Sequence, residues 1–205
     1  MIKLYTLFPD RLNLNGDQGN LVVLLKRLAW SKVGCEIVNI NSVGEIESLA
    51  AELQVNPTNA FVFLGHGSIA AMKSISQHKT EIEGLIALCR NLGVPAMVVG
   101  SSYSWLVPHA IVDRVSEFRT LDLVFAGETH EVTGYLNSSD SLPAIVAEGN
   151  TIYTLLHGPV LLKSLTLTEA ICRLLSQAEM GKLDDRIVGY AVSYTHLTLP
   201  TILLV

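Results

Sequence analysis

Three segments of the chain combine glycines and polar residues in patterns that could support chemistry. The first, residues 10–20, reads DRLNLNGDQGN and follows an apolar stretch that is typical of a strand. In an α/β sheet such a loop lies at the carboxyl end of its strand, where ligands and partners bind. It has neither of the glycine spacings that bind phosphate, G-x-x-x-x-G-K-[ST] and G-x-G-x-x-G. A structural role is also open, because Asp17 or Asn15 could cap the helix that follows.

The second segment is Gly65-His66-Gly67-Ser68, which comes directly after an apolar run. Glycines at this position, Gly65 and Gly67, would let backbone N–H groups approach a ligand closely, as an oxyanion hole requires. The same glycines could instead serve a turn that needs a positive φ. His66 is more typical of a turn residue than of a catalyst.

The third pattern pairs residues 97–106, which read MVVGSSYSWL, with the distant His157. A strand that turns sharply into a helix, with small residues at the bend, is typical of a nucleophile elbow, which exposes one side chain above the sheet. His157 could act as the base, although a histidine at a strand end is often structural. One hypothesis is a serine hydrolase, because small residues lie two positions on either side of Ser102 and His157 follows it in the chain.

The elements that would position these segments alternate along the first half of the chain. Strands are expected at residues 2–7, 36–40, 60–64 and 95–99, and helices at 21–30, 45–53 and 69–91. This alternation predicts βαβ units around a parallel sheet. Later strands are expected at 121–126, 131–135, 144–147 and 151–156, with a turn at residues 148–150. A final helix, capped at Thr166 with Glu169 three residues on, should run to about residue 180.

Composition narrows the class of protein. The chain has 205 residues and a net charge of 14 − 19 = −5, and 49% of it is hydrophobic against 16% charged. These values exclude intrinsic disorder and predict one globular domain, residues 1–191. No apolar run reaches the roughly 18 to 20 residues that span a bilayer, so membrane insertion is not expected. Lysines and arginines are scattered, which gives no electrostatic footprint for nucleic acid.

The two ends of the chain and its cysteines bear on where the protein acts. The first ten residues lack the apolar stretch and cleavage site of a signal peptide, and the three cysteines are widely spaced without a C-x-x-C motif. We therefore expect a cytoplasmic protein with reduced thiols, and no metal or cofactor. Residues 192–205 carry no charge and resemble the translation of a sequencing adaptor, so we expect a non-native tail there.

Taken together, these segments resemble the class I glutamine amidotransferases of the cobyric-acid-synthase (CobB/CobQ-like) type, most closely the GatD subunit of lipid II isoglutaminyl synthase. The similarity covers roughly residues 2–180. Its most specific parts are residues 10–13 (DRLN), 16–20 (GDQGN) and 156–161 (LHGPVL), followed by Lys163. The resemblance implies a flavodoxin-like fold, mostly a parallel sheet with helices on both faces and a few antiparallel strands. It also implies a partner, a MurT-like Mur ligase that amidates a peptidoglycan precursor.

In that family, a cysteine at the elbow attacks the amide of glutamine, and a histidine, here His157, activates it. The family elbow usually reads Cys-Gly-Gly-Tyr-Gln, and the matching residues here are Gly100-Ser101-Ser102-Tyr103-Ser104. The nucleophile is therefore absent at Gly100. Close relatives also carry Asp-Arg-Glu-Gln where this chain has Ile69-Ala70-Ala71-Met72. The resemblance thus predicts a subunit that has lost glutaminase activity.

The resemblance also assigns roles to other residues. Gly65, Gly67 and Ser101 would bind glutamine if the pocket is functional, and Arg119 is the nearest candidate for the arginine that helps to hold it. Within residues 10–20, the partner-facing positions would be Asp10, Asn13, Asp17 and Asn20.

Two alternatives to the degenerate subunit remain at this point. One is the serine hydrolase that uses Ser102 and His157. The other is an active glutaminase, which either uses another nucleophile or carries a sequence error at position 100. Cys89 is not an obvious substitute, because it lies eleven residues before the elbow in an expected helix.

Overall fold

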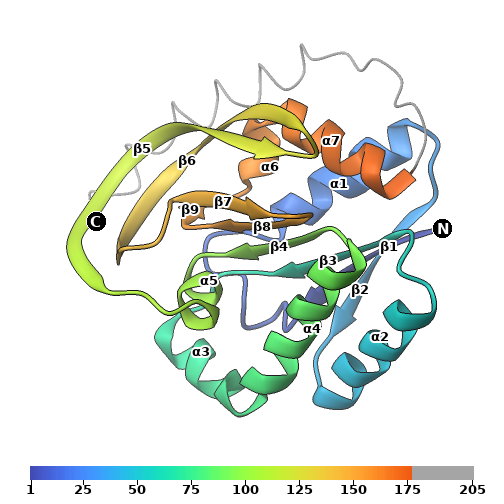
Figure 1. Ribbon diagram of the computed structural model, residues 1–205, viewed down its shortest axis with the longest axis horizontal. Helices are drawn as coiled ribbons and strands as arrows, with labels where there is room; N and C mark the ends of the chain where they lie inside the picture. Colours follow the sequence, from blue (N-terminus) through green and yellow to red (C-terminus); the bar gives the residue numbers. More distant parts are fainter. Residues whose placement is uncertain (177–205) are drawn as a thin grey trace.

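The computed structural model describes residues 1–176, and its centre is a sheet of six strands in the order β2-β1-β3-β4-β8-β7 (Figure 1). The first five strands in this order run parallel, and β7 pairs antiparallel with β8. In chain order the bounds are β1 Ile2–Leu7, β2 Cys35–Ile40, β3 Ala60–Leu64, β4 Ala96–Val99, β7 Ile145–Glu148 and β8 Thr151–Thr154. This is the predicted flavodoxin-like α/β fold, with its characteristic 2-1-3-4 strand order.

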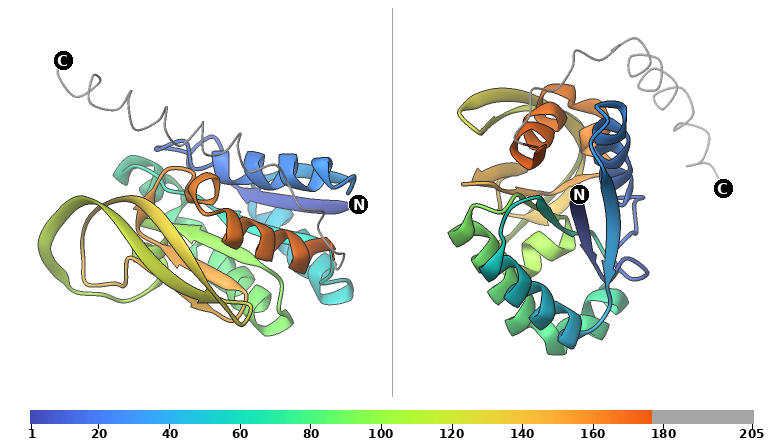
Figure 2. Two further views of the ribbon diagram at one scale, coloured as in Figure 1. Left: turned by 90° about the horizontal axis from the view of Figure 1, so that it is seen from above. Right: turned by 90° about the vertical axis from the view of Figure 1, so that its right-hand side faces the viewer.

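Helices cover both faces of the sheet. One face carries α1 (Gly19–Trp30), α6 (Val160–Lys163) and α7 (Leu165–Ser176), and the other carries α2 (Val43–Val55) and α4 (Lys79–Leu92) (Figures 1 and 2). Each longer helix buries residues at helical spacing; in α4 these are Ile82, Leu85, Ile86 and Cys89. Because β3 and β4 are buried along their whole length, the core lies on both sides of the central strands.

The predicted helix over residues 69–91 is divided. It consists of α3 (Ile69–Ile75), a single 3₁₀ turn at Ser76–His78, and α4, which ends at Gly93 with φ 70° as predicted. The final helix starts one residue before the predicted cap. The N–H of Thr168 donates to the carbonyl of Ser164, so Thr166 lies inside α7 rather than at its boundary.

A long antiparallel hairpin, β5 (Ile111–Phe125) and β6 (Glu128–Asp140), curves away from the main sheet (Figures 1 and 2). Its two-residue turn, Ala126-Gly127, has φ values of 52° and 81°, which match the right-handed twist of the strands. A short strand, β9 (Leu156–His157), pairs with β6 and completes a sheet of three. The hairpin therefore brings His157 opposite Tyr135.

The hairpin is longer than the predicted strands 121–126 and 131–135. Residues 111–120 are almost wholly exposed, so they lack the half-buried alternation from which strands are predicted. The turn predicted at residues 148–150 is confirmed as a two-residue connection, Gly149-Asn150, between β7 and β8.

Two predictions concern residues outside the described range, namely the domain end at residue 191 and the tail at 192–205. Within residues 1–176, no helix is long and apolar enough to cross a lipid bilayer. Helix α5 (Ser101–Leu106) follows β4 directly and forms one wall of the candidate site.

Candidate functional site

The connection between β4 and α5 is a sharp bend at Gly100. Its backbone has φ 58° and ψ −124°, a conformation that L side chains rarely adopt. The Gly100 N–H donates to the carbonyl of Thr154 at 2.7 Å, so the bend is held against the neighbouring strand β8. This is the elbow geometry that the small residues predicted, and we call Gly100 and Ser101 the elbow.

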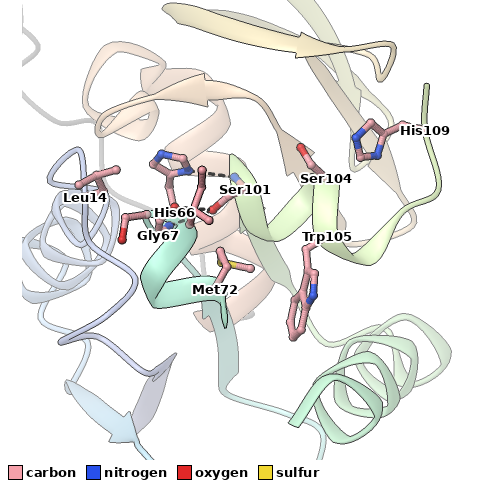
Figure 3. A pocket seen from close by; sticks show the side chains of 10 residues that line it. Leu14, His66, Gly67, Met72, Ser101, Ser104, Trp105 and His109 are labelled. Carbon is pink, nitrogen blue, oxygen red and sulfur yellow. Dashed lines mark hydrogen bonds between the residues drawn. The ribbon is translucent and has the colours of Figure 1, made fainter. Parts of the chain in front are cut away.

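The space above the elbow is filled by His66. A Cβ atom on Gly100 would lie 2.5 Å from Nδ1 and 2.8 Å from Cγ of the His66 ring. The backbone N–H of Ser101 donates to His66 Nδ1 at 2.9 Å, which fixes the imidazole over the bend (Figure 3). A nucleophilic side chain at position 100 would therefore compete with His66 for the same space.

The backbone donors that could form an oxyanion hole are also occupied. The Gly67 N–H donates to Ser101 Oγ at 3.0 Å, and the Ser101 hydroxyl donates to the Gly67 carbonyl at 2.9 Å. With the Ser101 N–H bonded to His66, both donors beside the elbow point at groups of the chain itself. An oxyanion would have to displace these internal partners.

Gly65 and Gly67 are required for close packing. A Cβ atom on Gly65 would lie 2.1 Å from the carbonyl oxygen of Leu12, and one on Gly67 would lie 2.7 Å from Leu12 Cδ2. Neither glycine has a positive φ, so the hypothesis that they serve a left-handed turn is wrong. They allow the segment 10–20 to pass directly over the end of β3.

His157 is held on both sides of its ring. Its Nε2 lies 3.3 Å from the carbonyl oxygen of Asn137, and its Nδ1 lies 2.8 Å from the Asn15 side-chain nitrogen. Because a carbonyl accepts and the Asn15 amide donates, the network assigns the proton of a neutral ring to Nε2. The His157 and His66 rings lie 4.8 Å apart. Burial lowers the pKa of His157, and burial with the nearby His157 lowers the pKa of His66 to about 4.

Asp17 connects three loops beneath the elbow. It is fully buried, and its Oδ2 accepts the backbone N–H of His66 at 3.0 Å, while the backbone N–H of Gly158 also donates to its carboxylate. Burial, the larger effect, raises the pKa of Asp17 to about 6, although both hydrogen bonds act to lower it. Its Oδ1 has no hydrogen-bond partner in the part of the chain that the structure describes.

Asn20 extends the same junction. Its side chain is fully buried, accepts the Leu161 N–H at 3.0 Å and donates to the Asp17 carbonyl at 2.9 Å. We call Asp17, Asn20 and the backbone groups they bind at His66, Gly158 and Leu161 the loop junction. The assignment of Asp17 and Asn20 to a partner-facing surface is therefore wrong, since both side chains are used inside the fold.

Other polar residues of that segment face solvent. Asp10 and Asn13 are exposed, and Asn13 Oδ1 accepts the Gln18 N–H at 3.0 Å. Helix α1 begins at Gly19 with Gln18 at its N-cap and no side-chain cap, so the capping role considered for Asp17 and Asn15 is also wrong. Of the four residues predicted to face a partner, Asp10 and Asn13 are therefore the two that are exposed.

The serine-hydrolase hypothesis is contradicted by the position of Ser102. This side chain is fully buried, and its hydroxyl donates to the carbonyl of Gly65 at 2.6 Å rather than facing His157.

The cysteines of the chain do not replace Ser102 as a nucleophile. Burial is the main cause that raises the pKa of Cys35 to about 11 and those of Cys89 and Cys172 to about 12, so their thiolates are scarce at neutral pH.

Arg119 lies away from the cavities at the elbow, whereas Arg114 lines one of them. Arg119 is exposed on β5, where its Nε donates to Glu117, and it lines neither cavity at the site. Arg114 lines the smaller one and donates to Asn137 Oδ1 at 2.8 Å. The pairing of β5 with β6 is irregular between Ile111 and Val115, and a bulge of this kind redirects side chains without a sequence signal.

Two adjoining cavities surround the elbow. The larger, about 620 Å³, is lined by residues that include Leu14, Met72 and Trp105 (Figure 3). The smaller, about 420 Å³, is lined by Arg114, Asn137, Asp140 and His157 among others. Among residues 1–176, no group of three or more histidine, cysteine or acidic side chains could hold a metal ion.

Comparisons with known proteins find similarity at the level of structure. No family model matches the chain, and no curated protein matches it. Among solved structures, the structure of PurLQS from Thermotoga maritima is similar at 11% sequence identity and a TM-score of 0.43, over 83% of this chain and 93% of that one. The function is therefore inferred from the residues of the site.

Proposed function

We propose that this chain is a GatD-like amidotransferase subunit that has lost glutamine hydrolysis and acts as a structural or regulatory subunit of a MurT-like Mur ligase. One observation carries the proposal. The His66 ring occupies the space above Gly100 and accepts the N–H of Ser101, so neither a nucleophile nor a free oxyanion donor stands at the elbow. Residues 10–20 and 156–161, which carry the resemblance to this family, contact each other and the His66 segment beside the elbow.

The chemistry of glutamine hydrolysis explains why these changes matter. The family reaction needs a thiolate that attacks the amide carbon and backbone donors that hold the resulting oxyanion. Glycine offers no side chain for an acyl-enzyme, and the three cysteines of the chain have pKa values of about 11 and 12. The active-glutaminase alternative would therefore need a cysteine at position 100 in place of the glycine, and His66 would have to move to admit it.

A subunit of this kind still has a role in amidation. In the proposed complex, the ligase activates a carboxylate of the muropeptide and takes free ammonia from solution. The present chain would brace the ligase or regulate it. The exposed residues Asp10 and Asn13 lie on the retained segment and are the proposed contact points.

The test is to co-express this chain with a MurT-like Mur ligase and to purify the complex. We expect a stable complex that amidates the muropeptide with ammonium chloride but not with glutamine. Asp10→Lys and Asn13→Lys should each weaken the complex at least tenfold, whereas Glu47→Lys, an exposed control on α2, should leave it unchanged. Failure to form a complex, or amidation supported by glutamine, would contradict the proposal.

A further inference from the structure

The larger cavity at the elbow is lined mainly by apolar side chains. Its apolar lining residues are Leu14, Ile69, Met72 and Trp105, and Figure 3 shows Met72 and Trp105 below the elbow residues. Two of these side chains are exposed to an unusual degree, Leu14 at 57% and Ile69 at 90%. Apolar side chains exposed at the rim of a cavity are typical of a site that binds an apolar group.

The hydroxyl groups on the same wall are already hydrogen-bonded within the chain. Ser101 exchanges hydrogen bonds with Gly67, and Ser68 accepts the Ala71 N–H at the start of α3. A carboxamide placed against the apolar side chains of this cavity would find these hydroxyl groups already bonded within the chain. The cavity therefore favours an apolar group over the side-chain amide of glutamine.

The smaller cavity continues the larger one and carries charges of both signs. Ser104 lines both, and its hydroxyl donates to the Asp140 carboxylate. Asp140 also lies 3.1 Å from Nε2 of His109, and its side chain is 18% exposed. Arg114 lines the same cavity, and its side chain is exposed. A cation and an anion are thus available within one cavity beside an apolar one.

We infer that the joined cavities bind a zwitterionic amino acid with an unbranched or branched apolar side chain. Its carboxylate pairs with Arg114, its ammonium group with Asp140, and its side chain lies against Ile69, Met72 and Trp105. The opposite charges of Arg114 and Asp140 fix the orientation of the bound amino acid, because the reverse placement would bring like charges together. This inference concerns the same pocket as the proposed function, and it rests on the proposed function in that respect alone.

The experiment uses Trp105 as its reporter. The chain has two tryptophans, and the other, Trp30, is 53% exposed on α1, so Trp30→Phe leaves Trp105 as the only indole. L-norleucine, whose side chain is about as long as that of glutamine but ends in a methyl group, is titrated against this variant and followed by fluorescence and calorimetry. We expect saturable binding at least tenfold tighter than that of L-glutamine.

Two modified ligands test the charged anchors. N-acetyl-L-norleucine lacks the ammonium group and L-norleucinamide lacks the carboxylate. Each should bind at least tenfold more weakly than L-norleucine, because a charge-assisted hydrogen bond is lost. They also stand for the last and first residues of a peptide, so tight binding of either one would identify a peptide end as the ligand and overturn the assignment of a free amino acid.

Matched variants test the residues. Arg114→Gln and Ile69→Ser should each weaken norleucine binding about tenfold. Their controls, Arg119→Gln on the same strand and Val55→Ser, which is 88% exposed on α2, should not change it. Equal effects of test and control variants would overturn the inference, as would glutamine binding as tight as norleucine binding or no saturable heat below about 10 mM, where affinity becomes negligible.

Ammonia release from glutamine, measured on the same samples, separates this inference from the proposed function. Hydrolysis would overturn the proposed function. Norleucine binding without hydrolysis supports both, and absence of norleucine binding without hydrolysis overturns the ligand assignment alone.

Discussion

The loop junction and the elbow lie next to each other at the carboxyl edge of the sheet, but their polar groups serve opposite purposes. At the loop junction, Asp17 and Asn20 are fully buried and bind backbone groups of two other loops. At the elbow, Gly100 has no side chain and His66 fills the space above it. The junction keeps the loops in position, whereas the elbow presents no reactive side chain at Gly100.

This difference shows why retained motif residues are weak guides to activity. Asp17 belongs to the best-matched segment of the resemblance, yet it acts as a structural tie and not as a contact for a partner. Removing such a buried hydrogen-bonding side chain destabilises the fold, because each unsatisfied buried donor or acceptor costs about 1 to 3 kcal/mol. Residues of this kind persist as long as the fold does, whatever happens to the chemistry.

The largest effect should come from breaking the loop junction. Asn20→Ala leaves the Leu161 N–H and the Asp17 carbonyl without their side-chain partner, so we expect a loss of roughly 2 to 4 kcal/mol in the free energy of unfolding. Asp10→Ala, an exposed control in the same segment, should cost less than about 0.5 kcal/mol. Urea denaturation measures both, and equal losses would show that the junction has no special role.

The elbow should respond to substitution through His66. Gly100→Ala places its Cβ 2.5 Å from His66 Nδ1 and forces a residue with a side chain to adopt φ 58°, so we expect it to cost about 2 to 3 kcal/mol. In a His66→Gly background only the backbone strain remains. A double-mutant cycle should therefore give a coupling of at least about 1 kcal/mol. Additive effects would mean that the imidazole does not occupy this space.

The two regions should also differ in the sign of their pH dependence. Asp17 has a folded pKa of about 6, above its ordinary 3.8, so its contribution is most favourable at low pH and is lost as the pH rises through that range. His66 has a folded pKa of about 4, below its ordinary 6.5, so its contribution is lost as the pH falls through that range. The two contributions oppose each other between pH 4 and 6.5.

Single variants separate these contributions. On going from pH 7.5 to pH 5, Asp17→Asn should lose about 1 kcal/mol more stability than the unaltered protein, because only the His66 contribution remains. His66→Gly should lose less than the unaltered protein over the same interval. Thermal unfolding at the two pH values checks both, and a shift of the same sign in the two variants would contradict the opposed pKa values.

The smallest effect on stability should come from the rim of the larger cavity. Ile69 is 90% exposed, so Ile69→Ser removes almost no buried surface and should change the free energy of unfolding by less than about 0.5 kcal/mol. A loss above about 1 kcal/mol in thermal or urea unfolding would show that Ile69 supports the fold instead of a ligand.

Much of the fold could be predicted because its strands are buried and periodic. The apolar runs at residues 2–7 and 60–64 coincide with β1 and β3, and Gly93 ends α4 as expected. The length of the hairpin formed by β5 and β6 was underestimated, because residues 111–120 are exposed on both faces and carry no pattern of burial. The sequence predicts strands whose burial imposes an apolar pattern, but it does not predict strands that are exposed on both faces.

The candidate site was harder to predict because its contacts join distant segments. The glycine at position 100 is visible in the sequence, but the imidazole that covers the bend comes from 34 residues earlier in the chain. Arg114 enters the cavity through a bulge that has no sequence signal, whereas Arg119, the residue that the resemblance indicated, lies on the exposed part of the hairpin. Side-chain direction, and not residue type, decides both cases.

Ammonia release from glutamine tests the central claim most directly. It should be measured for the unaltered chain with its ligase-like partner, for Gly100→Cys, and for Gly100→Cys combined with His66→Gly. We predict no ammonia release from the unaltered chain or from the single variant. In the double variant the space above position 100 is open, so the new thiol at the elbow should react with iodoacetamide. Release of ammonia by the unaltered chain would contradict the account.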